Sequence, residues 1–239
     1  MVWLQALIVN TVLIALAQRL PLLTRWGWVH AGILGTVLWG SLGWTGWLSV
    51  VLYLGLGSAV TKLGFSDKQR RGLAEARGGC RSPLNVWGSA ATGASLALLI
   101  AAGLEPKPWL LAAFAASFAA KLADTFGSEI GKRWGRTPRL ITTLRRVEPG
   151  TEGAISMEGT LASAVGSLLM AVVMWALALL PSLSWMWLVA VVGLVATLAE
   201  SVLGAVAQTR LSWMSNELVN ALQTSFAAVL MVALVALIP

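Results

Sequence analysis

Apolar segments long enough to cross a lipid bilayer recur along this chain and limit what it can fold into. A membrane-spanning helix needs about 20 apolar residues. The 239 residues are 57% hydrophobic and only 11% charged, which excludes an ordinary soluble domain. Alternating apolar and polar segments, as in a transmembrane β-barrel, are missing. We therefore predict one all-α, polytopic integral membrane domain over residues 1–239. Its eight predicted spans are 2–19, 28–42, 46–63, 85–104, 108–131, 155–180, 184–209 and 216–237.

The net charge of +7 suggests nucleic-acid binding only until its distribution is considered. If all eight spans cross the membrane, 15 of the 17 Lys and Arg residues fall on one side. Cytoplasmic loops carry such an excess of positive charge, so this side is predicted to be cytoplasmic, with both termini outside. The first span has no basic residue before it and no cleavage site after it, and is expected to be retained. A multi-pass protein of a bacterial inner or thylakoid-type membrane is expected.

The segment from Lys121 to Gly135 places charges where a membrane helix is expected. A charge in the membrane costs about 3 kcal/mol or more unless it is paired, solvated or bound. At 100° per residue, Lys121, Asp124, Thr125, Ser128 and Glu129 share one helix face within an arc of about 140°. Lys121 and Asp124 have the i, i+3 spacing of an ion pair. This face is a candidate functional site.

A faint internal repeat relates the fourth and fifth spans to the sixth and seventh. Leu122-Ala-Asp-Thr125 in the fifth span is matched by Leu198-Ala-Glu-Ser201 in the seventh. An offset of two spans preserves orientation, so the repeat would be parallel, with its axis along the membrane normal. It predicts Asp124 and Glu200 at equivalent depths on paired helices.

Five carboxylates lie in or at the ends of the predicted spans, too many for Lys121 alone to neutralise. They are Asp124, Glu129, Glu158, Glu200 and Glu217. Pairing with loop arginines, a proton relay and binding of a divalent cation are the alternatives. One Cys and one His leave no Cys/His zinc site. Mg²⁺ instead prefers oxygen ligands, usually one or two carboxylates completed by water and substrate phosphates.

Two long loops, 62–84 and 132–153, are basic and rich in glycine. Arginine and lysine side chains bind phosphate oxygens, and turns such as Gly150-Thr-Glu-Gly153 expose backbone N–H groups to anions. Basic charge alone can also reflect topology, because cytoplasmic loops tend to be basic. The motif of a P-loop is absent. Together with the carboxylates, these loops favour phosphoryl or nucleotidyl transfer at the membrane surface.

Three motifs resemble those of the integral membrane family that includes the plastid phytyl-phosphate kinase of vitamin E (tocopherol) synthesis. They are Arg81-Ser-Pro-Leu-Asn-Val-Trp-Gly-Ser-Ala-Ala91, Leu122-Ala-Asp-Thr-Phe-Gly-Ser-Glu-Ile-Gly131 and Gly150-Thr-Glu-Gly-Ala-Ile-Ser-Met-Glu-Gly-Thr160. Segments 200–208 and 216–220 are similar to its later motifs, and the plant and cyanobacterial branch is most similar. The resemblance implies a lipid-phosphate kinase that transfers a phosphoryl group from a nucleoside triphosphate, with CTP expected, to a phytyl or polyprenyl monophosphate.

The chemistry of such a kinase suggests a role for each candidate residue. Asp124 and Glu200 are expected to hold Mg²⁺, with Glu129 as a third ligand or beside them. Lys121 would bridge the transferring phosphoryl group. The predicted catalytic residues are thus Lys121, Asp124, Glu129 and Glu200. Arginines are expected to clamp the donor triphosphate, and two asparagines to orient phosphate oxygens. The predicted substrate- and nucleotide-binding residues are Arg77, Arg81, Asn85, Thr125, Ser128, Arg145, Arg146, Thr151, Glu152, Glu158, Ser201, Asn216 and Asn220.

Two other classes of protein remain open at this point. An ion-coupled transporter or flippase of an anionic lipid or small anion would use the intramembrane charges as a relay, near the bilayer midplane and with access from both sides. A noncatalytic lipid-binding scaffold would bind no nucleotide. The kinase places its acids near the cytoplasmic face. Asp124 and Glu129 are within about two helical turns of Lys132, which favours the kinase.

Overall fold

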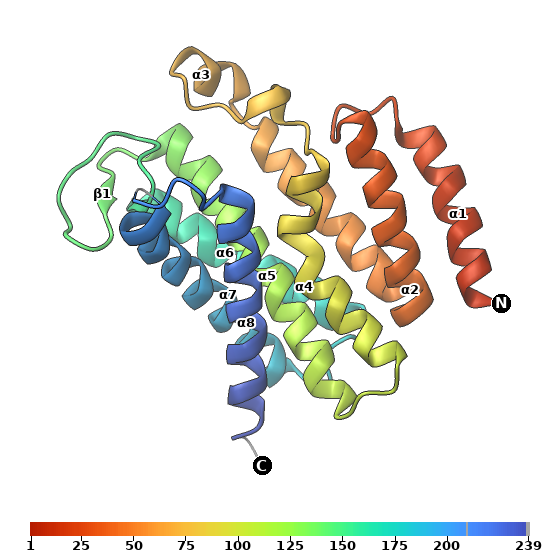
Figure 1. The fold of residues 1–239 in the computed structure, drawn as a ribbon. Coiled ribbons are helices and arrows are strands. Elements are labelled where there is room, and N and C mark those ends of the chain that lie inside the picture. The colour runs from red at the N-terminus through yellow and green to blue at the C-terminus, as the bar shows by residue number, and fades with distance from the viewer. Residues whose placement is uncertain (209, 238–239) are drawn as a thin grey trace.

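The computed structural model describes residues 1–208 and 210–237 as a bundle of helices (Figure 1). Within these residues, six helices are long and apolar enough to cross a membrane, and α1 is a shorter apolar helix. The predicted helical polytopic fold is confirmed. The short helix is α1 (Val2–Ala17), and the six long helices are α2 (Arg25–Lys62), α4 (Pro83–Ala101), α5 (Lys107–Trp134), α6 (Met157–Ala176), α7 (Leu183–Leu203) and α8 (Asn216–Val235).

Helix α2 consists of two antiparallel halves that meet at Gly43. This residue has a φ of 73° and a ψ of −170°, a conformation that only glycine adopts readily. The rings of Trp39 and Trp47 lie 5.3 Å apart, and a Cβ on Gly35 would lie 3.1 Å from Nε1 of Trp47. In a continuous helix, Gly35 and Trp47 would be separated by about 18 Å. The predicted second and third spans are therefore the two halves of α2.

The central helix is α5, which packs against α2, α4, α6, α7 and α8. Every residue from Ala112 to Ala123 is buried. Alanine dominates this stretch, and small side chains allow neighbouring helices to approach closely. The rings of Phe114 and Phe118, 5.1 Å apart, fill the remaining space. Because α5 is surrounded in this way, the polar side chains of its last turns are directed into the bundle rather than into lipid.

Helices α5 and α6 are in close contact at Gly127 and Gly159. A Cβ on Gly127 would overlap Oγ of Ser163. A Cβ on Gly159 would lie 2.9 Å from the backbone oxygen of Gly127. At Gly159 the obstacle is backbone, so a side chain there requires one of the helices to move, whereas at Gly127 the first obstacle is the Ser163 side chain.

Both long loops fold over the same end of the bundle, which we call the basic end (Figure 1). The first loop contains α3 (Phe65–Arg70) and the 3₁₀ turn η1 (Ala76–Gly79). The second contains β1 (Arg139–Leu140), paired antiparallel with β2 (Ala154–Ile155). A backbone bridge between Leu23 and Arg81 joins the α1–α2 connection to the first loop. The π-helical turn η2 (Gly204–Gln208), which continues α7, packs against Gly153 of the second loop.

Candidate functional site

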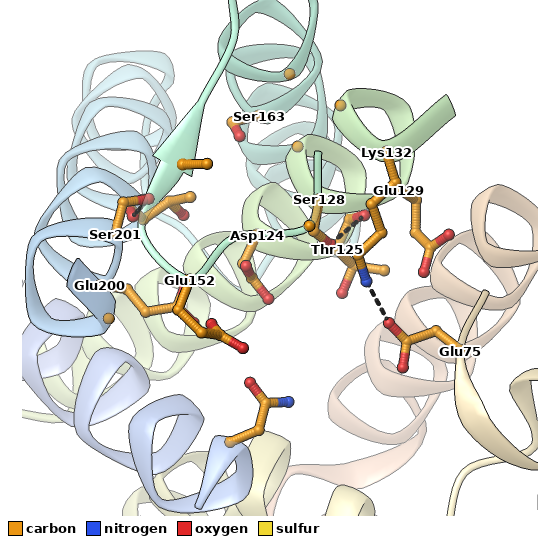
Figure 2. Close-up of a pocket in the computed structure, with 18 of the residues that line it drawn as sticks. Glu75, Asp124, Thr125, Ser128, Glu129, Lys132, Glu152, Ser163, Glu200 and Ser201 are labelled. Atoms are coloured by element: carbon orange, nitrogen blue, oxygen red, sulfur yellow. Dashed lines mark hydrogen bonds and ion pairs between the residues drawn. The ribbon is translucent and has the colours of Figure 1, made fainter. Parts of the chain in front are cut away.

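A cavity of about 440 Å³ lies at the basic end, among the helix ends and the two long loops (Figure 2). Its walls come from α2, α4, α5, α6, α7 and α8, together with η1 and the loop that precedes β2. The four predicted catalytic residues, Lys121, Asp124, Glu129 and Glu200, all line it. Residues from the fifth and the seventh predicted spans therefore meet at one cavity.

Three of the helices that form the cavity begin at it, each with a serine N-cap. The hydroxyl of Ser82 accepts a hydrogen bond from the Asn85 backbone N–H at the start of α4. Ser156 does the same for Gly159 in α6 (3.1 Å), and Ser215 for Leu218 in α8 (3.3 Å). Such caps define where a helix starts. The partial positive charge of each helix N-terminus then faces the basic end, which favours anions there.

Asp124, Glu152 and Glu200 form an acidic group in the cavity. They come from α5, the second loop and α7, and Figure 2 shows their side chains directed toward the same region. Asp124 and Glu200 are near enough for the charge of each to act on the other. Gly153 holds the loop close to α7, because a Cβ there would lie 2.5 Å from the backbone oxygen of Ser201. Carboxylates this close repel one another unless a cation or a proton compensates.

Lys121 supplies part of the compensating charge. Its ammonium group forms an ion pair with Asp124 and donates a hydrogen bond to Oδ1 of Asn220 on α8 (2.7 Å). The predicted i, i+3 ion pair is confirmed. A buried ammonium group requires such partners, and they fix its position beside the acidic group.

Glu129 has a different partner from the one expected. Its carboxylate forms a buried ion pair with Lys68 of α3, and Lys68 also donates to the backbone oxygen of Thr61 (2.9 Å). The structure thus does not bring Glu129 together with Asp124 and Glu200 as three metal ligands. Among the residues that the structure describes, no group of three or more His, Cys, Asp or Glu side chains is arranged to hold a metal ion.

Two loop carboxylates have perturbed pKa values. Burial alone would raise the pKa of Glu75. The Lys132 ammonium group, 2.7 Å away, has the larger effect, so the pKa lies below its usual value. Burial raises the pKa of Glu152; Lys132 opposes this, while the charges of Asp124 and Glu75 add to it. The pKa of Glu152 is thus raised mainly by desolvation, and the neighbouring negative charges make a smaller contribution.

The lining of the cavity also includes two arginines, Arg77 and Arg81. Nη1 of Arg81 donates to the hydroxyl of Tyr53 (2.7 Å), and Nη2 of Arg77 donates to Oδ1 of Asn85 (3.0 Å). The Asn85 amide also donates to Glu217 on α8 (3.0 Å). Asn85 lines the cavity, but its side chain is occupied in holding α4, Arg77 and α8 together.

Most of the predicted substrate-binding residues line the cavity. These are Arg77, Arg81, Asn85, Thr125, Ser128, Thr151, Glu152, Ser201, Asn216 and Asn220. Three predicted residues lie outside its lining. Arg145 and Arg146 are exposed between β1 and β2, where the backbone of Arg146 bridges to Arg139. Glu158 lies in the first turn of α6, where its charge favours the helix dipole.

Sequence reasoning missed four residues that shape the cavity: Tyr53, Lys68, Glu75 and Lys132. Each acts through a partner far along the chain, such as Lys68 with Glu129 and Lys132 with Glu75. The sequence did contain one indication of Glu75, because acidic residues occur within the basic loops although membrane topology does not require them. It did not identify their partners.

The fold and the site define a polytopic helical membrane protein with a charged cavity at one end of the bundle. The sequence profile of the family described as Integral membrane protein DUF92 matches residues 8–228, and the chain belongs to this family. It is 46% identical over 235 residues to an uncharacterized membrane protein of Synechocystis sp., covering 97% of this chain and 91% of the relative.

Two further relatives come from a plant and an archaeon. The chain is 35% identical over 235 residues to the chloroplastic protein VTE6 of Arabidopsis thaliana, covering 95% of this chain and 70% of the relative. It is 30% identical over 219 residues to an uncharacterized membrane protein of Methanocaldococcus jannaschii, covering 92% and 88%. The family resemblance seen in the motifs is confirmed. No solved structure matches the chain.

Proposed function

We propose that the protein is a prenyl-phosphate kinase that acts at the cytoplasmic face of the membrane. It would transfer a phosphoryl group from a nucleoside triphosphate, with CTP as the expected donor, to phytyl or another polyprenyl monophosphate. The observation that carries the proposal is the cavity itself, whose lining combines an acidic group of three carboxylates with Arg77 and Arg81. Membership of the family and the motifs shared with its phytyl-phosphate kinase support this reaction.

The chemistry needs little from a general base, because a phosphate monoester is already ionised at neutral pH. An oxygen of the acceptor phosphate attacks the γ-phosphorus of the donor. The bond between that phosphorus and the oxygen bridging to the β-phosphate breaks, and its electron pair leaves with the β-phosphate. The products are a prenyl diphosphate and a nucleoside diphosphate. The main obstacle is to bring two polyanions together, so catalysis depends on positioning and on neutralising charge.

Lys121 is suited to bind the transferring group. An ammonium group has three N–H donors, and among the described residues its hydrogen-bond partners are Asp124 and Asn220. The remaining N–H is available for a phosphoryl oxygen. Because both partners are fixed on helices, the ammonium group is held in place before substrate binds, which favours catalysis.

The acidic group has the chemistry of a Mg²⁺ site. Asp124 and Glu200 line the same cavity, and the charge of each acts on the other, so a cation or a proton would stabilise the pair. We expect these two carboxylates to hold the ion, with substrate phosphates completing its coordination, as is usual for Mg²⁺. When bound, the ion would neutralise part of the charge on the donor phosphates. Glu152 lies beside them, and Glu129 remains with Lys68.

The depth of the acids supports a kinase over a transporter or flippase. Asp124 and Glu200 line a cavity at the basic end, whereas the opposite half of α5, from Ala112 to Ala120, is packed against other helices and buried. Alternating access would require these charges to be reached from both sides of the membrane.

A direct assay tests the proposal. Purified protein would be incubated with phytyl phosphate, Mg²⁺ and, separately, CTP, ATP, UTP and GTP, and the products separated by chromatography. Phytyl diphosphate formed with one or more donors is the expected result. No diphosphate with any donor, from protein that is folded and reconstituted in lipid, would contradict a kinase; the absence of nucleotide binding would indicate the lipid-binding scaffold.

A further inference from the structure

The cations that line the cavity differ in whether a carboxylate neutralises them. Lys121 is paired with Asp124, and Lys132 with Glu75. Within the described part of the chain, Arg77 and Arg81 have no carboxylate within ion-pair distance. Arg77 is exposed, whereas Arg81 is half-buried. An arginine that is held away from water without an acidic partner is suited to bind an anion.

Arg81 is fixed in place by both its side chain and its backbone. Its guanidinium group donates to the hydroxyl of Tyr53 (2.7 Å) and lies 5.1 Å from the centre of the Tyr53 ring. Tyr53 is only 3% exposed and packs on Phe118, with ring centroids 5.4 Å apart. The Arg81 backbone N–H donates to Leu22 (3.0 Å), and its carbonyl accepts from Thr24 (3.0 Å). A guanidinium group has five N–H donors, so most of them remain for a ligand.

A glycine makes room for this arrangement. A Cβ on Gly57 would lie 2.5 Å from Nη2 of Arg81, so any side chain at this position would displace the guanidinium group. Tyr53 and Gly57 both belong to the second half of α2. They precede Lys62, the last residue of the helix, by about two and a half turns and about one and a half turns. The guanidinium group thus lies against a membrane-spanning helix, deeper than the loops.

The two expected substrates differ in how they reach the cavity. A prenyl monophosphate keeps its chain in the hydrocarbon, so its phosphate must bind near a helix that borders lipid. Helix α2 exposes Val51 (40%) and Leu52 (38%) next to buried Tyr53. A nucleoside triphosphate is water-soluble and reaches the cavity through the loops, next to the acidic group.

On this basis, and resting on the proposed function, we propose that Arg81 binds the phosphate monoester of the lipid acceptor, and that Tyr53 is the residue that positions it. This differs from the role in donor binding expected from the sequence. The donor phosphates then lie with the acidic group and Lys121, and the transferred phosphoryl group passes from the donor to the acceptor within one cavity.

Equilibrium binding separates this proposal from the kinase assignment. Wild-type protein in lipid nanodiscs would be titrated with phytyl monophosphate, phytol or CTP, each alone, so that no turnover is needed. Arg81→Lys keeps the charge but loses the bidentate fork, and is expected to weaken phytyl monophosphate binding about tenfold. The dissociation constants for phytol and CTP should stay within about twofold, since neither involves this subsite.

Tyr53→Phe keeps the ring and removes only the hydroxyl that holds Arg81. It is expected to weaken phytyl monophosphate binding about threefold to tenfold, the effect of one hydrogen bond, and to leave CTP binding unchanged. Arg136→Lys, at an exposed loop arginine outside the cavity, is the matched control and should bind all three compounds as wild type does.

Two outcomes overturn the proposal. If Arg81→Lys weakens CTP but not phytyl monophosphate, Arg81 belongs to the donor site; if it changes neither, Arg81 binds no substrate phosphate. Conversely, wild-type protein that binds phytyl monophosphate through Arg81 but forms no diphosphate with any nucleotide would overturn the kinase and leave this subsite intact.

Discussion

The ammonium group of Lys68 on α3 forms an ion pair with the carboxylate of Glu129 on α5, and the two side chains are 0% and 2% exposed. Arg133 and Lys132, also on α5, pair with Asp67 and Glu75 of the same loop. Three ion pairs thus hold the first loop against the central helix. The loop is therefore a fixed wall of the cavity.

Removing Lys68 tests this role. Lys68→Met leaves Glu129 buried without a partner and is expected to destabilise the protein by about 3 kcal/mol. The double variant Lys68→Met/Glu129→Leu replaces the pair with apolar side chains and should recover most of that loss. The measurement is denaturant unfolding in a fixed detergent. Equal stability of Lys68→Met and wild type would show that the pair contributes nothing.

Asp124→Asn tests the acidic group. The amide keeps the shape of the side chain but removes the charge that pairs with Lys121 and that we expect to hold Mg²⁺, so Mg²⁺-dependent turnover should fall at least about 100-fold. The protein should remain folded, as judged by its thermal transition. Glu105→Gln, at the opposite end of the bundle, is the control and should keep the wild-type rate. Normal turnover by Asp124→Asn would remove Asp124 from the mechanism.

Gly127→Ala tests the contact between α5 and α6. The added methyl group would overlap Oγ of Ser163, and overpacking of this kind destabilises by about 1–3 kcal/mol. Replacing Ser163 with Ala in the same protein removes the overlapping oxygen and should restore part of the stability. If the single variant unfolds as wild type does, the helices are not held at this distance by Gly127.

The ion pair between Glu75 and Lys132 predicts how stability depends on pH. Lys132 holds the pKa of Glu75 below its usual value of 4.5 in spite of burial, so the unfolded chain takes up this proton more readily than the folded one. The stabilisation is therefore complete above about pH 4.5 and is lost as the pH falls through the lower, folded-state pKa. It is expected to be below about 1 kcal/mol, because the Glu75 side chain is half exposed.

The comparison with Glu75→Gln isolates this effect. The variant should unfold at slightly lower denaturant concentration than wild type at pH 7, and the two should become equal below the folded-state pKa. A difference that persists or grows on acidification would show that the charge of Glu75 is not the source.

Features that depend on spacing within one segment could be predicted from the sequence. The spans follow from the length of the apolar runs, and the pair of Lys121 and Asp124 follows from the helical repeat. In contrast, Arg81 and Tyr53 are 28 residues apart, and Lys68 and Glu129 are 61 apart. The pattern of one helix does not specify which residue of another will face it.

The predicted roles of Arg145 and Arg146 show a second limit. Their charge and their loop were read correctly, but the pairing of β1 with β2 draws the ends of that loop together and leaves both arginines exposed. Charge composition identified the loop that contributes to the cavity. It did not identify which residues of the loop reach inside.

The pairing of Lys121 with Asp124 also affects how α5 enters the membrane while the chain is being synthesised. Lys121 has its counter-charge one turn away on the same helix, whereas Asn220, its other partner, is synthesised 99 residues later. Chains emerge from the ribosome N-terminal end first, so α5 is made before α8. A charge pair contained within one helix lowers the cost of placing that helix in lipid. The central helix can therefore enter the bilayer with its charges already matched, and the cavity is completed when the last helix arrives.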